Sequence, residues 1–246
     1  MPAVIIPARY ASSRFCGKLI APLGGVPLIV HTAASALKSK AESVYVVADD
    51  KRIAEALAEI EREAEGRLKI IISDPAIPTG TDRVAFAAKR TAGDIIINVQ
   101  GDEPFIPPAL LDDLITLLES DETIGMASAC VRFDDADNPN HVKVVMDRDN
   151  FALYFSRSPI PFDRDKKNPV RYKHIGIYAF RRETLFRFAA LKPSALESAE
   201  MLEQLRALEN GMRIKMLLTD YFPISVDTED DLKAAEAALK EREFGE

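Results

Sequence analysis

The fold of this chain is decided by residues 43–72, SVYVVADDKRIAEALAEIEREAEGRLKIII. The β-branched run at residues 43–48 predicts a strand, the charged segment 51–64 predicts a helix, and the apolar residues 68–72 predict a second strand. Strand, helix and strand in this order make a crossover unit that joins two parallel strands. The nearly continuous apolar runs suit strands that are covered on both faces of a sheet.

The same alternation extends in both directions along the chain. We expect a strand at residues 3–6, helices at 27–39 and 81–90, and a further strand at 94–99. The sequence therefore predicts an α/β fold with a mostly parallel central sheet flanked by helices, similar to a Rossmann domain.

The alternation of strands and helices ends after residue 124, where strand-like segments follow one another with few helices between them. These segments are residues 124–131, 141–146, 152–156 and 174–180. They predict a smaller antiparallel extension of the parallel sheet. The remaining expected elements are a helix at 196–209, strands at 213–218 and 224–227, and a final helix at 229–242 that Thr228 caps with Asp231.

Composition narrows the classes of protein that this chain can belong to. The chain has 246 residues, of which 47% are hydrophobic and 29% are charged, so it can bury a full core. No apolar run approaches the roughly 20 residues of a membrane span, and no signal peptide is visible, so we expect a cytoplasmic protein. The net charge of −7 argues against a nucleic-acid partner, and two cysteines, Cys16 and Cys130, argue against a disulfide framework or a zinc site.

A basic loop follows the first strand. It carries three cations, Arg9, Arg14 and Lys18, together with two serine hydroxyls and Gly17. Ligands of α/β folds bind at the carboxyl ends of strands, and arginine forks and a lysine ammonium both suit phosphate oxygens. The loop therefore predicts a polyphosphate site, although it is neither a dinucleotide fingerprint nor a Walker loop. The alternative is a solvated surface loop that happens to be basic.

Two acidic positions stand at other predicted strand ends. Asp102 follows residues 94–99 within NVQGDEP, where Gly101 allows a close turn, and Asp227 precedes the final helix. Carboxylates at the ends of nonadjacent parallel strands can share one Mg²⁺, which proteins hold by one or two carboxylates plus substrate phosphates. The alternatives are a simple turn at Asp102 and a helix cap at Asp227. Between them, PTGTDR at residues 78–83 could press Gly80 and two threonines against a planar base.

Taken together, these motifs resemble the 3-deoxy-manno-octulosonate cytidylyltransferases, the CMP-Kdo synthetases of bacterial lipopolysaccharide synthesis. The resemblance covers essentially the whole chain in order. Its blocks are PARYASSRFCGK at residues 7–18, TGTDR at 79–83, NVQGDEP at 98–104, ALYFSRSPIPFDRD at 152–165, HIGIYAFR at 174–181, EMLEQLR at 200–206 and VDT at 226–228. One position departs from the family, because Cys16 stands where a proline usually precedes the Gly-Lys pair, which removes a fixed backbone φ from the loop.

The resemblance implies an activity, a cofactor and a set of site residues. The implied reaction joins CTP and Kdo to give CMP-Kdo and pyrophosphate, with Mg²⁺ as cofactor and a homodimer as the assembly. The residues implied for the triphosphate are Arg9, Ser13, Arg14 and Lys18, those for the cytidine are Thr79, Gly80, Thr81 and Gln100, and those for the metal are Asp102 and Asp227. The residues implied for the sugar acid are Arg157, Arg164, His174, Tyr178, Glu203 and Gln204, with Arg157 or Arg164 pairing with its carboxylate.

The same resemblance divides the chain by role. We expect one nucleotidyltransferase domain over residues 1–246, in which about 1–120 bind CTP, about 124–210 bind the sugar and form the dimer, and about 211–246 return a strand and the last helix. His174 could be a sugar ligand, a general base or a buried, satisfied histidine.

Three alternatives to a Kdo enzyme stay open. The chain could serve 8-amino-Kdo or a sialic-type acid, or it could be a non-catalytic protein that binds nucleotides. A glycosyltransferase is disfavoured because residues 102–103 read D-E where such enzymes carry a D-x-D pair.

Overall fold

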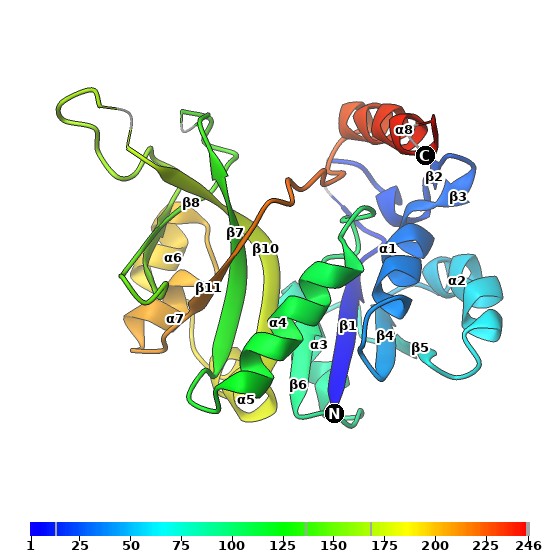
Figure 1. The fold of residues 1–246 in the computed structure, drawn as a ribbon. Helices are drawn as coiled ribbons and strands as arrows, with labels where there is room; N and C mark the ends of the chain where they lie inside the picture. The colour runs from blue at the N-terminus through cyan, green and yellow to red at the C-terminus, as the bar shows by residue number, and fades with distance from the viewer. Residues whose placement is uncertain (13, 136, 168, 245–246) are drawn as a thin grey trace. The chain divides into compact units, whose positions relative to one another are not determined.

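The computed structural model describes residues 1–12, 14–135, 137–167 and 169–244, and the chain forms two compact units. The first unit comprises Met1–Asp113 with Pro223–Glu246, and the second is Leu114–Phe222 (Figure 1). The division falls within helix α4, Pro108–Ser120. The first unit therefore contains both ends of the chain.

The first unit is built on four parallel strands. These are β1 (Pro2–Ala8), β4 (Ser43–Ala48), β5 (Leu68–Ile72) and β6 (Ile95–Asn98), in the spatial order β6-β1-β4-β5. Every residue of β1 is buried, as expected for a strand covered on both faces. The predicted α/β fold with a parallel sheet is confirmed.

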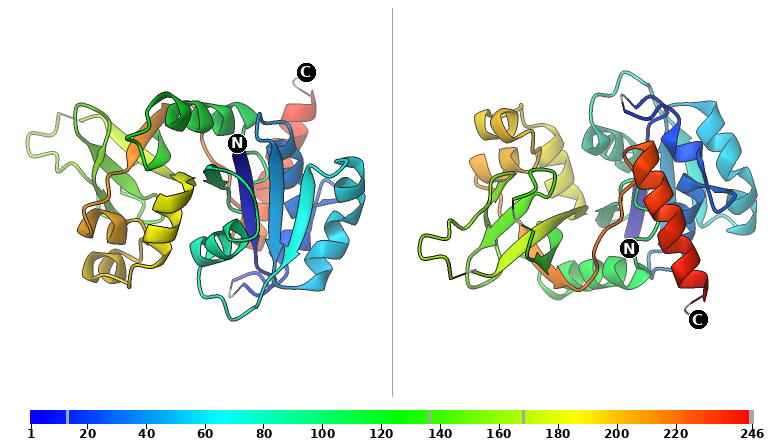
Figure 2. Two further views of the ribbon diagram at one scale, coloured as in Figure 1. Left: turned by 90° about the horizontal axis from the view of Figure 1, so that it is seen from below. Right: turned by 90° about the horizontal axis from the view of Figure 1, so that it is seen from above.

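Helices cover this sheet on both faces. Strands β1, β4 and β5 are joined by α1 (Leu28–Leu37) and α2 (Lys51–Glu63), and α3 (Gly80–Ala88) carries the chain back to β6. Because parallel crossovers are right-handed, α1 and α2 lie on one face and α3 on the other (Figure 2). The carboxyl ends of the four strands meet at a single edge, where the connecting segments lie close together.

Shorter elements complete the first unit near that edge. The basic loop ends in a 3-10 turn, η1 (Lys18–Ile20), which is followed by the hairpin of β2 (Pro22–Leu23) and β3 (Val26–Pro27). The last helix, α8 (Glu229–Phe244), starts at a capping box: Asp231 N donates to the Thr228 hydroxyl at 3.2 Å, and Thr228 N donates to the Asp231 carboxylate at 2.8 Å. The predicted cap of the final helix is confirmed.

The second unit has a mixed sheet. Strand β7 (Met126–Phe133) pairs antiparallel with β10 (Arg171–Arg181) and parallel with β11 (Lys215–Thr219). Strand β8 (Lys143–Met146) pairs antiparallel with both β10 and β9 (Ala152–Ser156). The predicted antiparallel strands are confirmed. Three short helices also belong to this unit, α5 (Arg182–Ala189), α6 (Ala195–Glu200) and α7 (Leu205–Glu209).

Two expectations about elements were wrong. The helix expected at residues 196–209 is two helices, because Met201 adopts a left-handed conformation with φ 53° and ends α6. Residues 224–227 form no strand among the described residues; instead Val226 N donates to the carbonyl of Asp102 at 3.0 Å. This bond and the one that the Ser225 hydroxyl donates to the Glu103 carboxylate hold the C-terminal segment at the NVQGDEP turn.

Across the described ranges, none of the helices combines the length and the apolar character needed to cross a membrane.

Candidate active site

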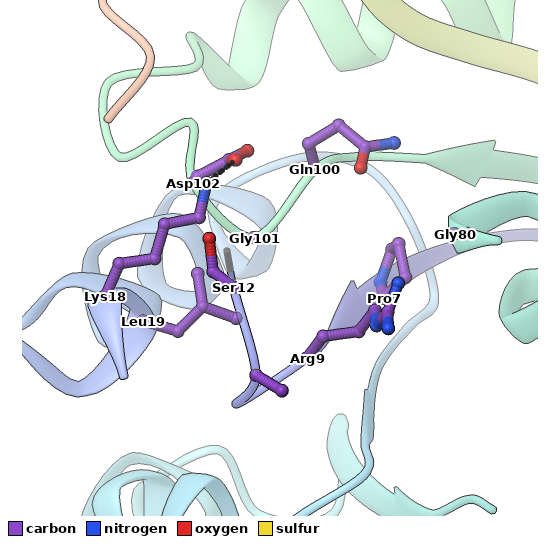
Figure 3. A pocket seen from close by; sticks show the side chains of 10 residues that line it. Pro7, Arg9, Ser12, Lys18, Leu19, Gly80, Gln100, Gly101 and Asp102 are labelled. Carbon is purple, nitrogen blue, oxygen red and sulfur yellow. Dashed lines mark hydrogen bonds and ion pairs between the residues drawn. The ribbon is translucent and has the colours of Figure 1, made fainter. Parts of the chain in front are cut away.

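A cavity of about 420 Å³ opens at the carboxyl edge of the parallel strands in the first unit. Its walls come from the ends of β1 and β6, from the basic loop and from the start of α3. The lining residues are Pro7, Arg9, Ala11, Ser12, Lys18, Leu19, Gly80, Gln100, Gly101 and Asp102. Figure 3 shows Lys18 and Asp102 meeting on one side of the cavity, whereas Pro7, Arg9 and Gly80 lie on the other. Its volume suits a nucleotide-sized ligand.

The two acids predicted for the metal are brought together by Lys18. Its Nζ lies 2.5 Å from Asp102 Oδ2 and 2.8 Å from Asp227 Oδ1. Arg14 adds a third positive contact, with Nη2 at 3.0 Å from Asp227 Oδ2. Asp102 and Asp227, which lie 84 and 209 positions after Lys18 in the sequence, thus converge on its ammonium group.

The electrostatics of this cluster favour positive charge between the carboxylates. Burial alone would lower the pKa of Lys18, but the charge of Asp102 and the hydrogen bonds to both acids outweigh it, so the pKa lies above its ordinary value. One ammonium therefore already occupies a point that both carboxylates can bind. This donor set fits Mg²⁺, for which two carboxylates are completed by phosphate and water oxygens. Among the described residues, groups of three or more His, Cys, Asp or Glu side chains suited to a metal are absent.

The basic loop is held in a closed conformation. Gly17 has φ 73°, in the left-handed region that favours glycine, and its N–H donates to the carbonyl of Tyr10 at 3.0 Å. The loop presents Arg14, whose side chain is 64% exposed, and Arg9, which is 47% exposed. Of the residues expected to hold the triphosphate, Arg9, Arg14 and Lys18 lie at this edge, while Ser13 lies outside the described residues.

The residues expected to meet the cytidine lie at the opposite wall. Gly80 and Gln100 line the cavity, and a Cβ added at Gly80 would lie 3.5 Å from Gln100 Oε1. Thr79 serves as the N-cap of α3, since its hydroxyl accepts from Asp82 N at 3.0 Å, and Thr81 is buried. Gly80 and Gln100 are therefore the members of this set that face the cavity.

Two residues that position the site were not predicted from the sequence. Thr32 on α1 donates from its buried hydroxyl to the carbonyl of Gly101 at 3.0 Å, and it thereby fixes the turn that carries Asp102. Asp49, at the end of β4, accepts from Tyr10 N at 2.7 Å and anchors the start of the basic loop. Its position after a parallel strand is the signal that could have identified it.

In the second unit, Arg157 is held by the backbone around Glu200. Arg157 Nε donates to the Glu200 carbonyl at 2.8 Å, and its Nη1 donates to the Pro139 carbonyl at 3.1 Å. The Glu200 carboxylate in turn accepts from Ser156 Oγ at 2.6 Å and from Arg157 N at 2.9 Å. Arg157 therefore ties the end of β9 to α6. Arg164 is exposed, and among the described residues it makes no hydrogen bond or ion pair, which leaves it the more accessible of the two arginines expected for the sugar acid.

His174 is a buried member of β10. Its Nε2 lies 2.8 Å from Ser128 Oγ, and its ring meets Phe155 edge-on at a centroid distance of 4.9 Å. The Ser128 hydroxyl donates to the Ile177 carbonyl at 2.7 Å, so Nε2 carries the proton and donates to Ser128. Burial lowers the pKa of His174 to about 3, which makes the ring a poor proton acceptor near neutral pH. The geometry favours a buried, satisfied histidine over a general base.

The other residues expected for the sugar acid lie near His174 or at the start of α7. The Tyr178 ring is 5.5 Å from that of His174, and burial and the charge of Glu203 raise the pKa of Tyr178. Glu203 also lies 3.7 Å from Arg206, and Gln204 is buried. The structure thus brings together His174, Tyr178 and Glu203 within one unit, and their contact with a sugar stays a prediction.

The chain matches a family model described as cytidylyltransferase over residues 3–214. It is 45% identical to proteins named 3-deoxy-manno-octulosonate cytidylyltransferase from Geotalea daltonii and Geobacter sulfurreducens, covering 97% and 96% of this chain and 98% of each relative.

Solved structures agree with this assignment. A CMP:2-keto-3-deoxy-manno-octonic acid synthetase complexed with CTP superposes with a TM-score of 0.92 at 35% identity, covering 98% of this chain and 99% of that one. A glucose-1-phosphate thymidylyltransferase from Bacillus anthracis shares the fold, with a TM-score of 0.72 at 15% identity, covering 98% of this chain and 96% of that one. The chain therefore belongs to the cytidylyltransferase family, among the 3-deoxy-manno-octulosonate cytidylyltransferases.

Proposed function

We propose that this protein transfers CMP from CTP to the anomeric hydroxyl of 3-deoxy-D-manno-octulosonate (Kdo), giving CMP-Kdo and pyrophosphate. The observation that carries the proposal is the convergence of Asp102 and Asp227 on one cation beside a cavity of about 420 Å³. Both acids belong to motifs by which the chain resembles its family. The relatives named as Kdo cytidylyltransferases support the choice of substrates.

The charged side of the cavity suits a triphosphate. Arg14 and Lys18 already contact Asp227, and Arg9 lines the cavity beyond them. These three cations neutralise negative charge that grows on the departing pyrophosphate when the anomeric oxygen attacks the α-phosphorus in line. Positioning and charge neutralisation are most of what phosphoryl chemistry asks of a protein.

Asp102 and Asp227 are proposed as the residues that hold Mg²⁺. Bound there, the ion would screen the charge of the phosphates and orient the triphosphate. Thr32 and Val226 fix the two acid-bearing segments through backbone bonds to Gly101 and Asp102. Gly80 and Gln100 border the space left for the cytosine.

The sugar acid is proposed to contact Arg164, Tyr178 and Glu203, with its carboxylate paired to an arginine. Arg157 and His174 are assigned to holding this region together, because their polar groups are engaged with Glu200 and Ser128. We further propose a homodimer as the working assembly and the cytoplasm as its location.

The test is turnover of CTP with Kdo and Mg²⁺, measured as both pyrophosphate and CMP-Kdo. The variant Asp102→Asn is expected to lower kcat by about 100-fold or more, because one of the two charged ligands proposed for the metal is lost. The matched control is Asp94→Asn, which removes a carboxylate that pairs with the N-terminal ammonium at the opposite ends of the strands. Near-normal turnover by Asp102→Asn would contradict the metal assignment.

Substrate choice is tested in the same assay. We expect Kdo to be preferred over 8-amino-Kdo and over a sialic-type acid at equal concentration. Pyrophosphate release that requires either of the other acids would redirect the proposal to that sugar. Binding of CTP without turnover of any of the three would indicate a non-catalytic protein.

A further inference from the structure

A buried ion pair that the proposed chemistry does not use lies behind the cavity wall. The side chain of Arg83 on α3 is 0% exposed and that of Asp49 is 6% exposed, with Arg83 Nη2 at 3.6 Å from Asp49 Oδ2. Burial lowers the pKa of Arg83, against the influence of Asp49, which raises it. Removing two charges from water costs several kcal/mol per ion, so a buried ion pair of this kind adds little net stability to the fold.

Asp49 connects this pair to the basic loop. Its Oδ1 accepts the backbone N–H of Tyr10 at 2.7 Å, and its Oδ2 lies 4.0 Å from Nε of Arg9. Arg9 lines the cavity, and its Nη1 donates to the Pro78 carbonyl at 3.3 Å. One carboxylate therefore sets both the start of the loop and the position of a cation that faces the ligand.

Arg83 connects the pair to a second wall of the cavity. Its Nη1 donates to Ser73 Oγ and, at 3.4 Å, to the Asp74 carbonyl, while Nη2 donates to the Ile77 carbonyl at 3.4 Å. Ser73, Asp74 and Ile77 belong to the connection between β5 and α3, which ends at Gly80 in the cavity wall. The guanidinium thus fixes the segment that delivers Gly80.

We propose that Asp49 and Arg83 are positioning residues that set the affinity for CTP. They act through Arg9 and through the connection that ends at Gly80, and they touch neither the proposed metal ligands nor Lys18 in any contact between described residues. This inference rests on the proposed function, because CTP is the ligand assigned to the cavity. Its consequence is a division of effects: nucleotide affinity depends on the pair, and affinity for the sugar acid does not.

The variant Asp49→Asn tests the inference with little change in volume. Asparagine keeps an oxygen for Tyr10 N and removes the charge that faces Arg9 and Arg83. We expect the dissociation constant for CTP, measured by isothermal titration calorimetry without sugar, to rise about tenfold. The KM for CTP should rise in parallel, while the KM for Kdo stays within twofold of wild type.

A second variant and a control keep the effect separate from stability. Arg83→Lys keeps the charge but loses the planar fork, so it should weaken CTP binding in the same direction. Asp94→Asn removes an exposed carboxylate at the far ends of the strands and should leave CTP affinity unchanged. The calorimetric stoichiometry gives the folded fraction of each variant.

The outcomes distinguish this inference from the proposed function. Unchanged CTP affinity in both variants overturns the positioning role. Loss of folding by both variants also overturns it, because the ion pair would then be required only for the fold. A wild-type protein that binds CTP but makes no CMP-Kdo sinks the proposed function and leaves the inference measurable. A wild-type protein that does not bind CTP overturns both.

Discussion

Gly101 illustrates how one residue determines the position of an acid. A Cβ added there would lie 3.0 Å from Ile29 Cδ1, 3.2 Å from the Pro7 carbonyl and 3.3 Å from Leu19 Cδ1. The backbone of Pro7 cannot give way cheaply, because β1 is buried throughout. The turn that carries Asp102 therefore leaves little room for a side chain at Gly101.

The variant Gly101→Ala is expected to lose about 1–3 kcal/mol of unfolding free energy through overpacking. It should also lower kcat, because Asp102 follows directly and moves with the turn. Urea unfolding and turnover measure the two effects. Gly176→Ala is the matched control, since nothing lies within 4 Å of a Cβ built there. Equal behaviour of the two variants would contradict the argument.

His174 links burial to pH dependence. Its folded-state pKa is lowered to about 3, whereas an unfolded histidine titrates near about 6.5. Between these values the unfolded chain binds more protons, so the stabilising effect is complete above about pH 6.5 and is lost progressively as the pH falls toward 3.

We expect the His174 contribution to the free energy of unfolding to fall by about 2 kcal/mol between pH 7 and pH 5. His174→Gln can keep a polar contact with Ser128, and it removes this titration, so its stability should vary less with pH. Urea unfolding of both proteins at the two pH values measures the difference. Parallel pH profiles of the two proteins would show that His174 does not cause the pH dependence of stability, which contradicts its lowered pKa.

At the scale of single elements, the cap of α8 determines where Asp227 lies. Thr228 and Asp231 exchange hydrogen bonds across the first turn, and Asp227 N also donates to Asp231 Oδ2 at 3.1 Å. The second metal-binding candidate is therefore the residue immediately before the cap of α8. Because Thr228 and Asp231 form the cap of α8, Asp227 is not a simple helix cap.

Thr228→Ala is expected to lose about 1 kcal/mol of stability, as N-cap substitutions do, and to lower kcat because Asp227 is no longer held. Ser194→Ala is the control, since Ser194 caps α6 with a capping box that includes Glu197. Both variants should be less stable by thermal unfolding, and only Thr228→Ala should lose turnover. Full activity of Thr228→Ala would show that the cap does not position Asp227.

Local patterns predicted most of the elements because propensity and packing agree in them. The strands at Ser43–Ala48, Leu68–Ile72 and Ala152–Ser156 have the expected bounds, since their apolar runs end at turn residues or charges. The prediction of one helix at 196–209 was wrong because the helix is interrupted at Met201. Methionine is a residue type that does not indicate a left-handed conformation. The segment 224–227 alternates apolar and polar residues like a strand, but Val226 N bonds to the Asp102 carbonyl instead.

The candidate site was predictable to the extent that strand ends identify it. Asp102 could be identified from the sequence because it follows the parallel strand β6. Its pairing with Asp227 was predicted through a strand at 224–227 that does not form, and Asp227 is instead brought to this edge by the bond from Val226 N to the Asp102 carbonyl. Asp49 was hidden because the adjacent Asp50 caps α2, accepting from Arg52 N at 2.9 Å, and the pair of acids looks like helix capping. The role of Arg83 depends on contacts ten residues away, which no local pattern contains.

At the scale of the whole molecule, the proposed homodimer has a direct test. Sedimentation equilibrium should give twice the chain mass of 27.2 kDa over the concentration range used for turnover. A mass of one chain at concentrations where the protein is active would remove the dimer from the proposal. The same measurement with CTP added shows whether dimerisation depends on the ligand.

The two cysteines differ in a way that is useful beyond the reaction. Cys16 is exposed in the loop closed by the Gly17–Tyr10 hydrogen bond, whereas Cys130 is buried and burial raises its pKa to about 12. Alkylating reagents attack thiolates, so the native fold directs them to Cys16. The natural sequence thus offers a single attachment point for a fluorophore, one residue before the glycine that shapes the loop and two before Lys18, with no engineered thiol.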